Sequence, residues 1–220
     1  MTLTAPDAMP SDLETLLQAV QDADSSSALL QATRALAASG HPGGAGLLVE
    51  VLAYNNPGAA VAAVDGLIAL GEAAVEALLQ LDPENYGARA WAVRALAGIG
   101  DVRGLEVLEE ALGTDVAASV RRAAARGLGS LKLSALPAEQ RPAVQQRCLA
   151  ALLAATGDGE WVVRYAVAVG LEQLARGLHP ADAAWHPLEQ GLTELSAAND
   201  GNPPVVQLRA KVALSRLPRR

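Results

Sequence analysis

An all-α fold is predicted by three features of this 220-residue sequence: its helix-forming composition, its scarcity of aromatic side chains, and a helical pattern of small residues that recurs along the chain. Alanine and leucine, which favour helices, account for 47 and 35 residues. Phenylalanine is absent, only six aromatic residues occur, and two isoleucines accompany 19 valines, so the residues that favour strands are scarce. A core of such small side chains stays free of voids only if its helices approach closely.

The recurring pattern centres on six leucines, which we call anchors and use as position 0. The residue at −4 is alanine in five cases and Val167 in the sixth, and the residue at −1 is always alanine or glycine. Positions −4, −1, 0 and +3 share one face of an α-helix, so the same packed stripe is predicted six times. The anchors are Leu36, Leu67, Leu96, Leu128, Leu171 and Leu214.

The intervals between anchors run 31, 29, 32, 43 and 43 residues. Helical pairs of the HEAT type occupy about 30 to 45 residues, so the intervals predict a right-handed α-solenoid of about five to six HEAT-like helical repeats, forming one domain over residues 1–220. In chain order we expect a leading helix near 11–21, helical pairs with longer second helices near 138–155 and 182–197, and a closing helix near 203–217. Residues 1–10 are predicted to be disordered.

Connections between these helices are marked by glycine, proline, serine and aspartate, chiefly at 22–27, 133–142, 178–183 and 199–204. Gly40, Gly71 and Gly100 each stand four residues after an anchor, where a helix end requires positive φ. The concave side of such a stack is expected to offer an extended surface for a partner or ligand.

The charge distribution argues against nucleic-acid binding, because the formal net charge is −7. Residues 1–80 hold nine acids and the single base Arg34, whereas the rest of the chain holds fifteen acids and sixteen bases. No signal peptide, transit peptide or membrane span is predicted, so a soluble cytoplasmic protein is expected.

Metal binding and nucleophilic catalysis find little support. Cys148 is the only cysteine, which excludes an intrachain disulfide, and its apolar helical neighbours predict a buried, unreactive thiol. His41, His179 and His186 each precede a proline at scattered positions, with no spacing typical of metal ligands, so no metal site is predicted.

Three arginines at position −7 each follow an aspartate by six or seven residues. The favoured interpretation is a ladder of Asp–Arg contacts that ties each turn between repeats to the next helix, and the alternative is direct contact with a ligand. The pairs are Asp82 with Arg89, Asp115 with Arg121, and Asp158 with Arg164.

Other cations and aromatics depart from the Ala/Leu pattern. Arg34, Arg94 and Arg126 recur at position −2, and Arg122 follows Arg121; they are either solvated helix faces or contacts for a carboxylate-bearing ligand. Aromatic rings in such a scaffold either fill packing space or stack on a conjugated ligand. Those near the arginines are Tyr86, Trp91, Trp161 and Tyr165.

One segment carries a resemblance to a known family. The run NYGARAWAVRALAGIGD at 85–101, with LIALGE at 67–72 and SVRRAAARGLG at 119–129, resembles the F-type subunit of the heterodimeric E/F phycobilin lyases. The likeness is most specific over residues 57–132. It implies a cyanobacterial or red-lineage HEAT-repeat protein that acts as a lyase only as a heterodimer with an E-type subunit. Such a lyase attaches phycocyanobilin, or a related open-chain tetrapyrrole, through a thioether to a cysteine of the phycocyanin α subunit. The reaction is expected near the site of phycobilisome assembly.

The resemblance also gives the unusual residues an expected role. The bilin is a transferred substrate rather than a permanently bound cofactor; its two propionates suit arginines and its flat conjugated system suits aromatic rings. Asp101 is the acid expected to assist proton delivery, with helix capping as the alternative. The expected bilin-binding residues are Tyr86, Arg89, Trp91, Arg94, Arg121, Arg122, Trp161, Arg164 and Tyr165.

Two other functions remain open at this point. One is a chaperone-like factor for phycobiliprotein maturation, and the other is a generic HEAT-repeat scaffold that binds an unrelated protein. In each case the end repeats, whose apolar edges need a cap or a partner, are expected to select that partner.

Overall fold

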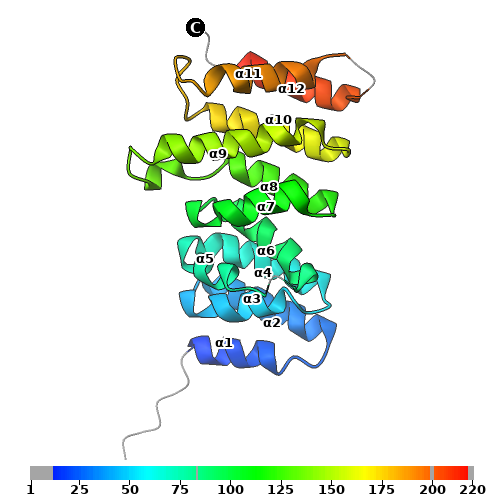
Figure 1. The fold of residues 1–220 in the computed structure, drawn as a ribbon. Helices are drawn as coiled ribbons and strands as arrows, with labels where there is room; N and C mark the ends of the chain where they lie inside the picture. Colours follow the sequence, from blue (N-terminus) through cyan, green and yellow to red (C-terminus); the bar gives the residue numbers. More distant parts are fainter. Residues whose placement is uncertain (1–11, 83, 199–200, 218–220) are drawn as a thin grey trace, which may run out of the picture. The chain divides into compact units, whose positions relative to one another are not determined.

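A computed structural model describes residues 12–82, 84–198 and 201–217, which form helices joined by turns and contain no strand (Figure 1). This confirms the all-α prediction. The chain folds into two compact units, one ending at Ala92 and the other beginning at Val93, within helix α6 (Tyr86–Ile99). Residues 1–10, predicted to be disordered, lie outside the described residues, and a single solenoid over the whole chain stays a prediction.

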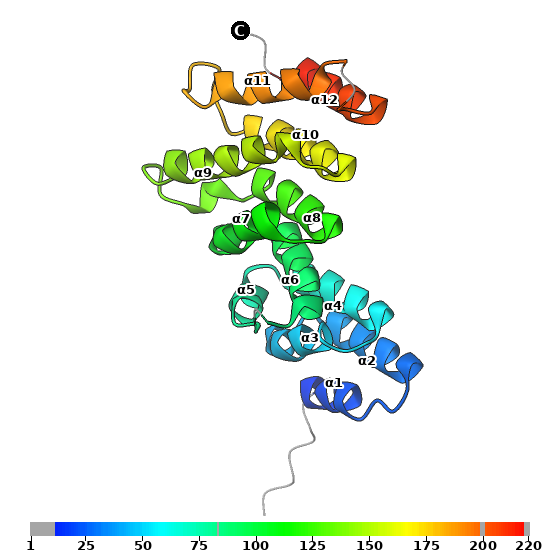
Figure 2. The same cartoon turned by 45° about the vertical axis from the view of Figure 1, so that its right-hand side comes forward.

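The N-terminal unit is built from helices that pack in antiparallel pairs. α2 packs against α1 and α4, and α3 packs against α4 and α5 (Figure 2). Besides the start of α6, its elements are α1 (Asp12–Gln21), α2 (Ser26–Ser39), the 3₁₀ turn η1 (Pro42–Gly44), α3 (Ala45–Val51), α4 (Pro57–Leu70) and α5 (Glu72–Leu79).

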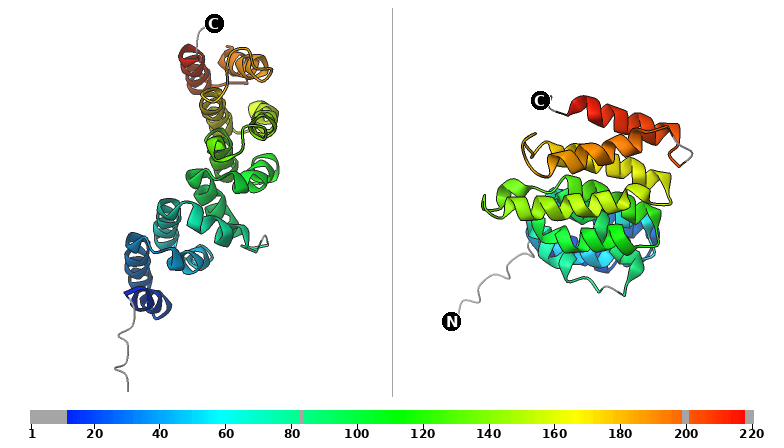
Figure 3. Two further views of the ribbon diagram at one scale, coloured as in Figure 1. Left: turned by 90° about the vertical axis from the view of Figure 1, so that its left-hand side faces the viewer. Right: turned by 45° about the horizontal axis from the view of Figure 1, so that its top comes forward.

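The C-terminal unit has two layers. The first helices of its pairs, α8 (Ala118–Gly129), α10 (Trp161–Ala175) and α12 (Pro204–Arg216), form one layer, green, yellow and red in Figure 3. The second helices form the other, with α9 packed against α7 and α11. These are α7 (Leu105–Thr114), α9 (Arg141–Ala154) and α11 (Trp185–Ser196), and the 3₁₀ turns are η2 (Val102–Gly104), η3 (Leu133–Ala135) and η4 (Ala155–Gly157).

The two longer anchor intervals add more loop than helix. α9 has 14 residues and α11 has 12, against 10 in α7, so the expected extra turns are short. The remaining residues lie at 130–140 and 176–184, where Pro137 and Pro180 cannot donate the backbone hydrogen bond that a longer helix would need.

The anchor stripe forms the core in both units. Five of the six anchors are at most 1 % exposed, and only Leu214 is half-buried. The small residue at −1 is buried in every repeat except the first, where Ala35 is exposed. This burial explains the repeated pattern, because each first helix presents positions −4, −1 and 0 to its neighbours.

Glycines and alanines let the first helices come almost into backbone contact. A Cβ added to Gly129 of α8 would lie 2.3 Å from the carbonyl oxygen of Gly170 in α10, and one added to Gly127 would lie 2.7 Å from the Cβ of Ala97. In the N-terminal unit, Gly66 approaches Ala37 in the same way, at 2.5 Å. The predicted close packing is therefore observed.

The three helix-ending glycines adopt the conformation that their spacing predicts. Gly40, Gly71 and Gly100 have φ of 62°, 61° and 70°, and among the described residues no other residue has positive φ. Gly100 is further constrained, because its carbonyl accepts a hydrogen bond from the backbone of Lys132 at 2.8 Å. No described helix is both long and apolar enough to cross a membrane.

Replacing Gly129 with alanine is expected to lower the free energy of unfolding by about 1–3 kcal/mol, because the new methyl group meets backbone rather than a movable side chain. Gly113 of α7 is the control: a Cβ there meets nothing within 4 Å, so Gly113→Ala is expected to be neutral or stabilising by up to about 1 kcal/mol. Urea denaturation of both variants checks this, and equal stabilities would contradict the close-packing argument.

Candidate functional site

Aspartates at the turns before α8 and α10 set up the local geometry. Asp115 and Asp158 each accept, through Oδ1, a hydrogen bond from the backbone N–H two residues later, at 2.8 Å in both cases. Asp82 does the same in the N-terminal unit, at 2.9 Å from the nitrogen of Glu84. These side-chain turns fix where the following first helix begins.

Arg121 joins two successive turns of the C-terminal unit. Its Nη1 donates to the backbone carbonyl of Asp115 at 2.9 Å, while Nε and Nη2 donate to the carboxylate of Asp158, 37 residues later, at 2.7 and 3.0 Å. The side chains of this pair are 16 % and 10 % exposed. The hydrogen bond from Arg121 lowers the pKa of the Asp158 carboxyl.

Arg164 repeats the arrangement one turn further along. Its guanidinium donates to the backbone carbonyls of Asp158 and Gly201, and its Nε donates to the side-chain oxygen of Asn202 at 2.9 Å. The predicted ladder is therefore present in this unit with one refinement: each arginine takes the backbone carbonyl of its own aspartate and the side-chain oxygen of the following turn.

Asn202 is not predicted from the sequence, because the recurring spacing pairs each arginine with an aspartate. It stands 12 residues before its anchor, whereas Asp115 and Asp158 each stand 13 before theirs. Aligning the turns as well as the helices would have indicated it. Glu172 is also missed: it is 5 % exposed and pairs with Arg209 and, at 3.2 Å, with Arg216 of α12. Burial raises the pKa of Glu172, but the hydrogen bonds from these two arginines outweigh it and the net shift is downward.

Asp101 is the capping residue of the short turn η2. Its Oδ1 accepts from the backbone nitrogen of Arg103 at 2.9 Å, and the Arg103 guanidinium donates to both carboxylate oxygens at 3.0 and 2.8 Å. The side-chain hydrogen bond from Arg103 lowers the pKa of Asp101. The carboxylate is therefore ionised at neutral pH, as suits a cap or a counter-ion.

Several predicted site residues share one exposed surface in the C-terminal unit. Positions −10, −6 and −2 of the first helices lie on one helix face, and all nine residues there are exposed or half-buried. We call this surface the first-helix face; it consists of Ala118, Arg122 and Arg126 on α8, Trp161, Tyr165 and Val169 on α10, and Pro204, Leu208 and Val212 on α12. The structure thus brings Arg122, Trp161 and Tyr165 onto the same face.

The remaining predicted residues are distributed differently. Tyr86, Arg89 and Trp91 belong to the N-terminal unit, where Tyr86 is 72 % exposed and the other two are half-buried. Arg94 is exposed on the part of α6 in the C-terminal unit, at the same −2 position as Arg126.

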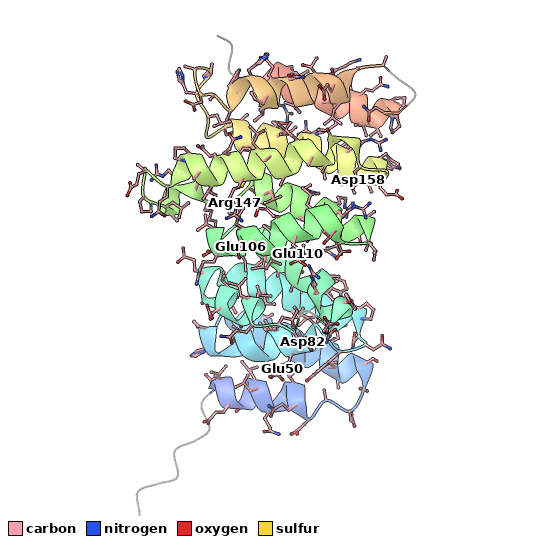
Figure 4. The ribbon with its side chains drawn as sticks, in the orientation of Figure 1. Glu50, Asp82, Glu106, Glu110, Arg147 and Asp158 are labelled. Carbon is pink, nitrogen blue, oxygen red and sulfur yellow. The ribbon has the colours of Figure 1, made fainter. Side chains whose placement is uncertain are left out.

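The two layers of the C-terminal unit differ in charge. The first helices α8, α10 and α12 carry seven bases and one acid, the buried Glu172. The second helices α7, α9 and α11 carry five acids and two bases; Figure 4 labels Glu106 and Glu110 on α7 and Arg147 on α9. Cations therefore gather on the layer that holds the exposed aromatic residues.

A groove of about 490 Å³ lies on the opposite, second-helix side. Its lining includes small residues such as Ala151 and Ala154, and its charged residues are Glu109, Asp115, Asp158 and Arg121. The one cation among these, Arg121, is paired with Asp158, and Glu109 is paired with Arg147 of α9.

Cys148 of α9 is fully buried, and burial raises the pKa of its thiol to about 12. Both features confirm the predicted buried thiol. The described residues also hold no cluster of metal-binding side chains, and the histidines outside helices act locally: the Nδ1 atoms of His41 and His179 accept backbone hydrogen bonds at 3.1 Å.

Comparison with known proteins places this geometry in a class and then in a family. The HEAT-repeat family matches residues 73–129, so this segment is built of HEAT repeats. "Phycocyanobilin lyase subunit beta" of Pseudanabaena tenuis is 50% identical over 209 residues, 94% of this chain and 73% of that protein. "Phycocyanin alpha phycocyanobilin lyase CpcF" of Synechocystis is 55% identical over 166 residues, 75% of this chain and 78% of that protein.

A solved structure agrees with these relatives. The complex of CpcE and CpcF of phycocyanin lyase from Nostoc contains a chain that is 41% identical to this one, with a TM-score of 0.70 over 78% of this chain and 98% of that chain. The protein therefore belongs to the F-type, or beta, subunits of the phycobilin lyases, as the resemblance at 57–132 implies.

The Arg121–Asp158 contact gives a testable pH dependence. Because the pKa of Asp158 is lower in the folded protein, the contact contributes its full stability above the ordinary aspartate pKa of about 3.9 and loses it as the pH falls through the lowered value. Asp158→Asn is expected to lower the free energy of unfolding by about 1–3 kcal/mol at pH 7, with a smaller difference from the unmodified protein at pH 3. Thermal unfolding at both pH values measures it; a difference that grows on acidification would contradict the pairing.

The buried thiol gives a second test. Cys148 in the native protein is expected to react with a thiol reagent at least about tenfold more slowly than after denaturation in guanidinium, because only the exposed thiolate reacts. Absorbance of the released reagent follows the reaction, and rapid labelling of the folded chain would contradict the assignment.

Proposed function

We propose that this chain is the F-type subunit of a bilin lyase that acts with an E-type subunit to attach phycocyanobilin, or a related open-chain tetrapyrrole, through a thioether to a cysteine of the phycocyanin α subunit. The observation that carries the proposal is the 50% identity to a phycocyanobilin lyase subunit over 94% of this chain. The likeness to a chain of the CpcE–CpcF complex supports the E-type partner. The cyanobacterial relatives support activity in the cytoplasm of a cyanobacterium.

The part of the first-helix face on α8 and α10 is the proposed bilin surface of the C-terminal unit. A bilin carries two propionate carboxylates and a flat conjugated system, which suit Arg122 and the rings of Trp161 and Tyr165. The groove on the second-helix side is less suitable, because its one lining cation among the described residues, Arg121, already binds Asp158, which leaves no other lining cation for a propionate. Trp161 is 46 % exposed, so its ring is accessible from solvent.

The other predicted contacts receive different roles in this proposal. Arg121 and Arg164 are positioning residues, because their guanidinium groups already bind successive turns and so hold α8 and α10 in register. Asp101 shapes its turn as an ionised cap and is unsuited to donate a proton while Arg103 holds it. Arg94, and Tyr86, Arg89 and Trp91 of the N-terminal unit, are retained as further bilin contacts.

The proposed chemistry is an addition that needs no redox partner. The acceptor thiol adds across the ethylidene double bond of the bilin: a carbon–sulfur bond forms, the carbon–carbon π bond breaks, and the proton lost by sulfur is balanced by one gained by the bilin. The acceptor protein supplies the sulfur, so Cys148 has no role in the step. The chain contributes by orienting the bilin, which favours one site and one stereochemical outcome of the addition.

Co-expression with bilin-synthesis enzymes, an E-type subunit and apo-phycocyanin α is expected to yield covalently pigmented α subunit, measured by zinc-enhanced fluorescence in a denaturing gel. Trp161→Ala combined with Arg122→Ala is expected to reduce pigment formation by about tenfold or more, since both groups would contact the bilin. Tyr54→Ala is the matched control, because Tyr54 is also an exposed aromatic residue, at 41 %, but lies in the turn after α3 and is not a proposed bilin contact.

Two outcomes contradict the proposal in different ways. A soluble complex that forms no covalent pigment with the complete set argues against lyase activity; retained bilin binding, seen as a shift in visible absorption, would then favour a maturation factor. Full activity in the Trp161/Arg122 variant would leave lyase function intact and reject the first-helix face as the bilin surface.

A further inference from the structure

The helix α12 exposes an apolar stripe that neither the core nor the proposed bilin contacts account for. Val205, Leu208 and Val212 follow a helical i, i+3, i+7 spacing and lie on one side of the helix. Leu208 is 64 % exposed and Val205 is 43 % exposed, although Val206, Ala210 and Ala213 of the same helix are completely buried. Exposed aliphatic side chains grouped on one helix indicate an interaction surface rather than scattered exposure.

The stripe continues the first-helix face. α12 packs against α10, and Leu208 and Val212 occupy the same −6 and −2 positions that Tyr165 and Val169 occupy on α10. A partner seated on α12 would therefore border the face proposed for the bilin. The exposed aromatic and arginine side chains beside it are the types that contribute most to binding at protein interfaces.

The charges around the stripe define the chemistry of its partner. Lys211 of α12 is exposed beside it, as is Arg216, which also pairs with Glu172, and α8 adds Arg122 and Arg126 on the far side of α10. The acid on these three helices, Glu172, is buried and already paired with arginines. A partner that fits has exposed apolar side chains surrounded by carboxylates.

The direction of approach is also restricted. Inside the unit, positions −3 and +1 face the next first helix, and on α8 they are the small residues Ala125 and Gly129, which pack against Gly170. On α12 these positions hold Lys211 and Ser215, both exposed, so another helix cannot approach there as closely. The partner is therefore expected to lie over the face of α12 instead of extending the stack of first helices.

We infer that Val205, Leu208 and Val212, with Lys211 and Arg216 at their rim, form the docking surface for an acidic, apolar-centred surface of the E-type subunit. This inference rests on the proposed function. A constitutive partner is favoured over the transient acceptor protein because the exposed leucine and valines require lasting cover. Docking at this place also encloses the neighbouring bilin surface and limits its access to water.

The test measures binding of purified E-type subunit to the full chain by isothermal titration calorimetry. Val205→Ser combined with Leu208→Ser is expected to raise the Kd by at least about tenfold, which corresponds to about 1.4 kcal/mol. Val116→Ser is the matched control: Val116 is 97 % exposed in the turn before α8, so its replacement is expected to change the Kd by less than about twofold. Circular dichroism melts verify that all variants fold, since none of these side chains is buried.

Charge provides an independent measurement. Lys211→Glu is expected to slow association with the E-type subunit. Added salt slows association of the unmodified protein, and it is expected to slow association of the variant less. An association rate that is insensitive to both salt and Lys211→Glu would overturn the acidic partner surface.

The outcomes separate this inference from the proposed function. Unchanged E-type binding by the Val205/Leu208 variant overturns the docking surface even if pigment transfer proceeds. The docking surface is also overturned if the variant keeps E-type binding but loses self-association or binding to phycocyanin α. Normal E-type binding by the unmodified chain without any pigment transfer defeats the lyase proposal and leaves the docking surface standing. If docking occurs as inferred, excess E-type subunit restores transfer by the variant, because mass action compensates for weaker binding.

Discussion

The close approach of neighbouring first helices is the constraint on which the rest of the C-terminal unit depends. At Gly129 and Gly170 the helices come so near that no side chain fits between their backbones. This spacing brings successive turns within reach of one arginine, so that Arg121 contacts Asp158 across 37 residues of sequence. Larger residues at these contacts would separate the helices and lengthen every hydrogen bond of the ladder. The unusual composition, rich in alanine and free of phenylalanine, is thus a requirement of the geometry.

Periodic features of this fold could be predicted from sequence because they depend on local spacing. The anchor leucines, the small residues beside them and the positive φ of Gly40, Gly71 and Gly100 each follow from a helical period or a helix end, and all are found as expected apart from the first and last repeats. The second helix expected near 138–155 is observed as α9, Arg141–Ala154, so it begins three residues later than predicted. Boundaries of this kind depend on single residues rather than on a pattern.

The site was harder to predict because its contacts join distant residues. Sequence spacing pairs Arg164 with Asp158, yet the structure adds Asn202, whose amide oxygen replaces a carboxylate. Glu172 resembles an ordinary surface acid until α12 brings Arg209 and Arg216 onto it. The anchor register predicts that Arg122, Trp161 and Tyr165 share one helix face. Only the folded unit shows that this face is exposed to solvent, because the opposite faces of the same helices are buried.

The polar residues on the edge of α12 have a consequence for how copies of the protein behave toward one another. Stacked repeats with an apolar open edge can join head to tail, and such joining has no natural stopping point, so filaments result. Lys211 and Ser215 stand where α8 and α10 carry alanine, glycine or glutamate, and an approaching edge would have to bury the lysine charge without a partner. The same two residues that leave the side of α12 as its accessible surface therefore oppose head-to-tail joining of copies through this helix.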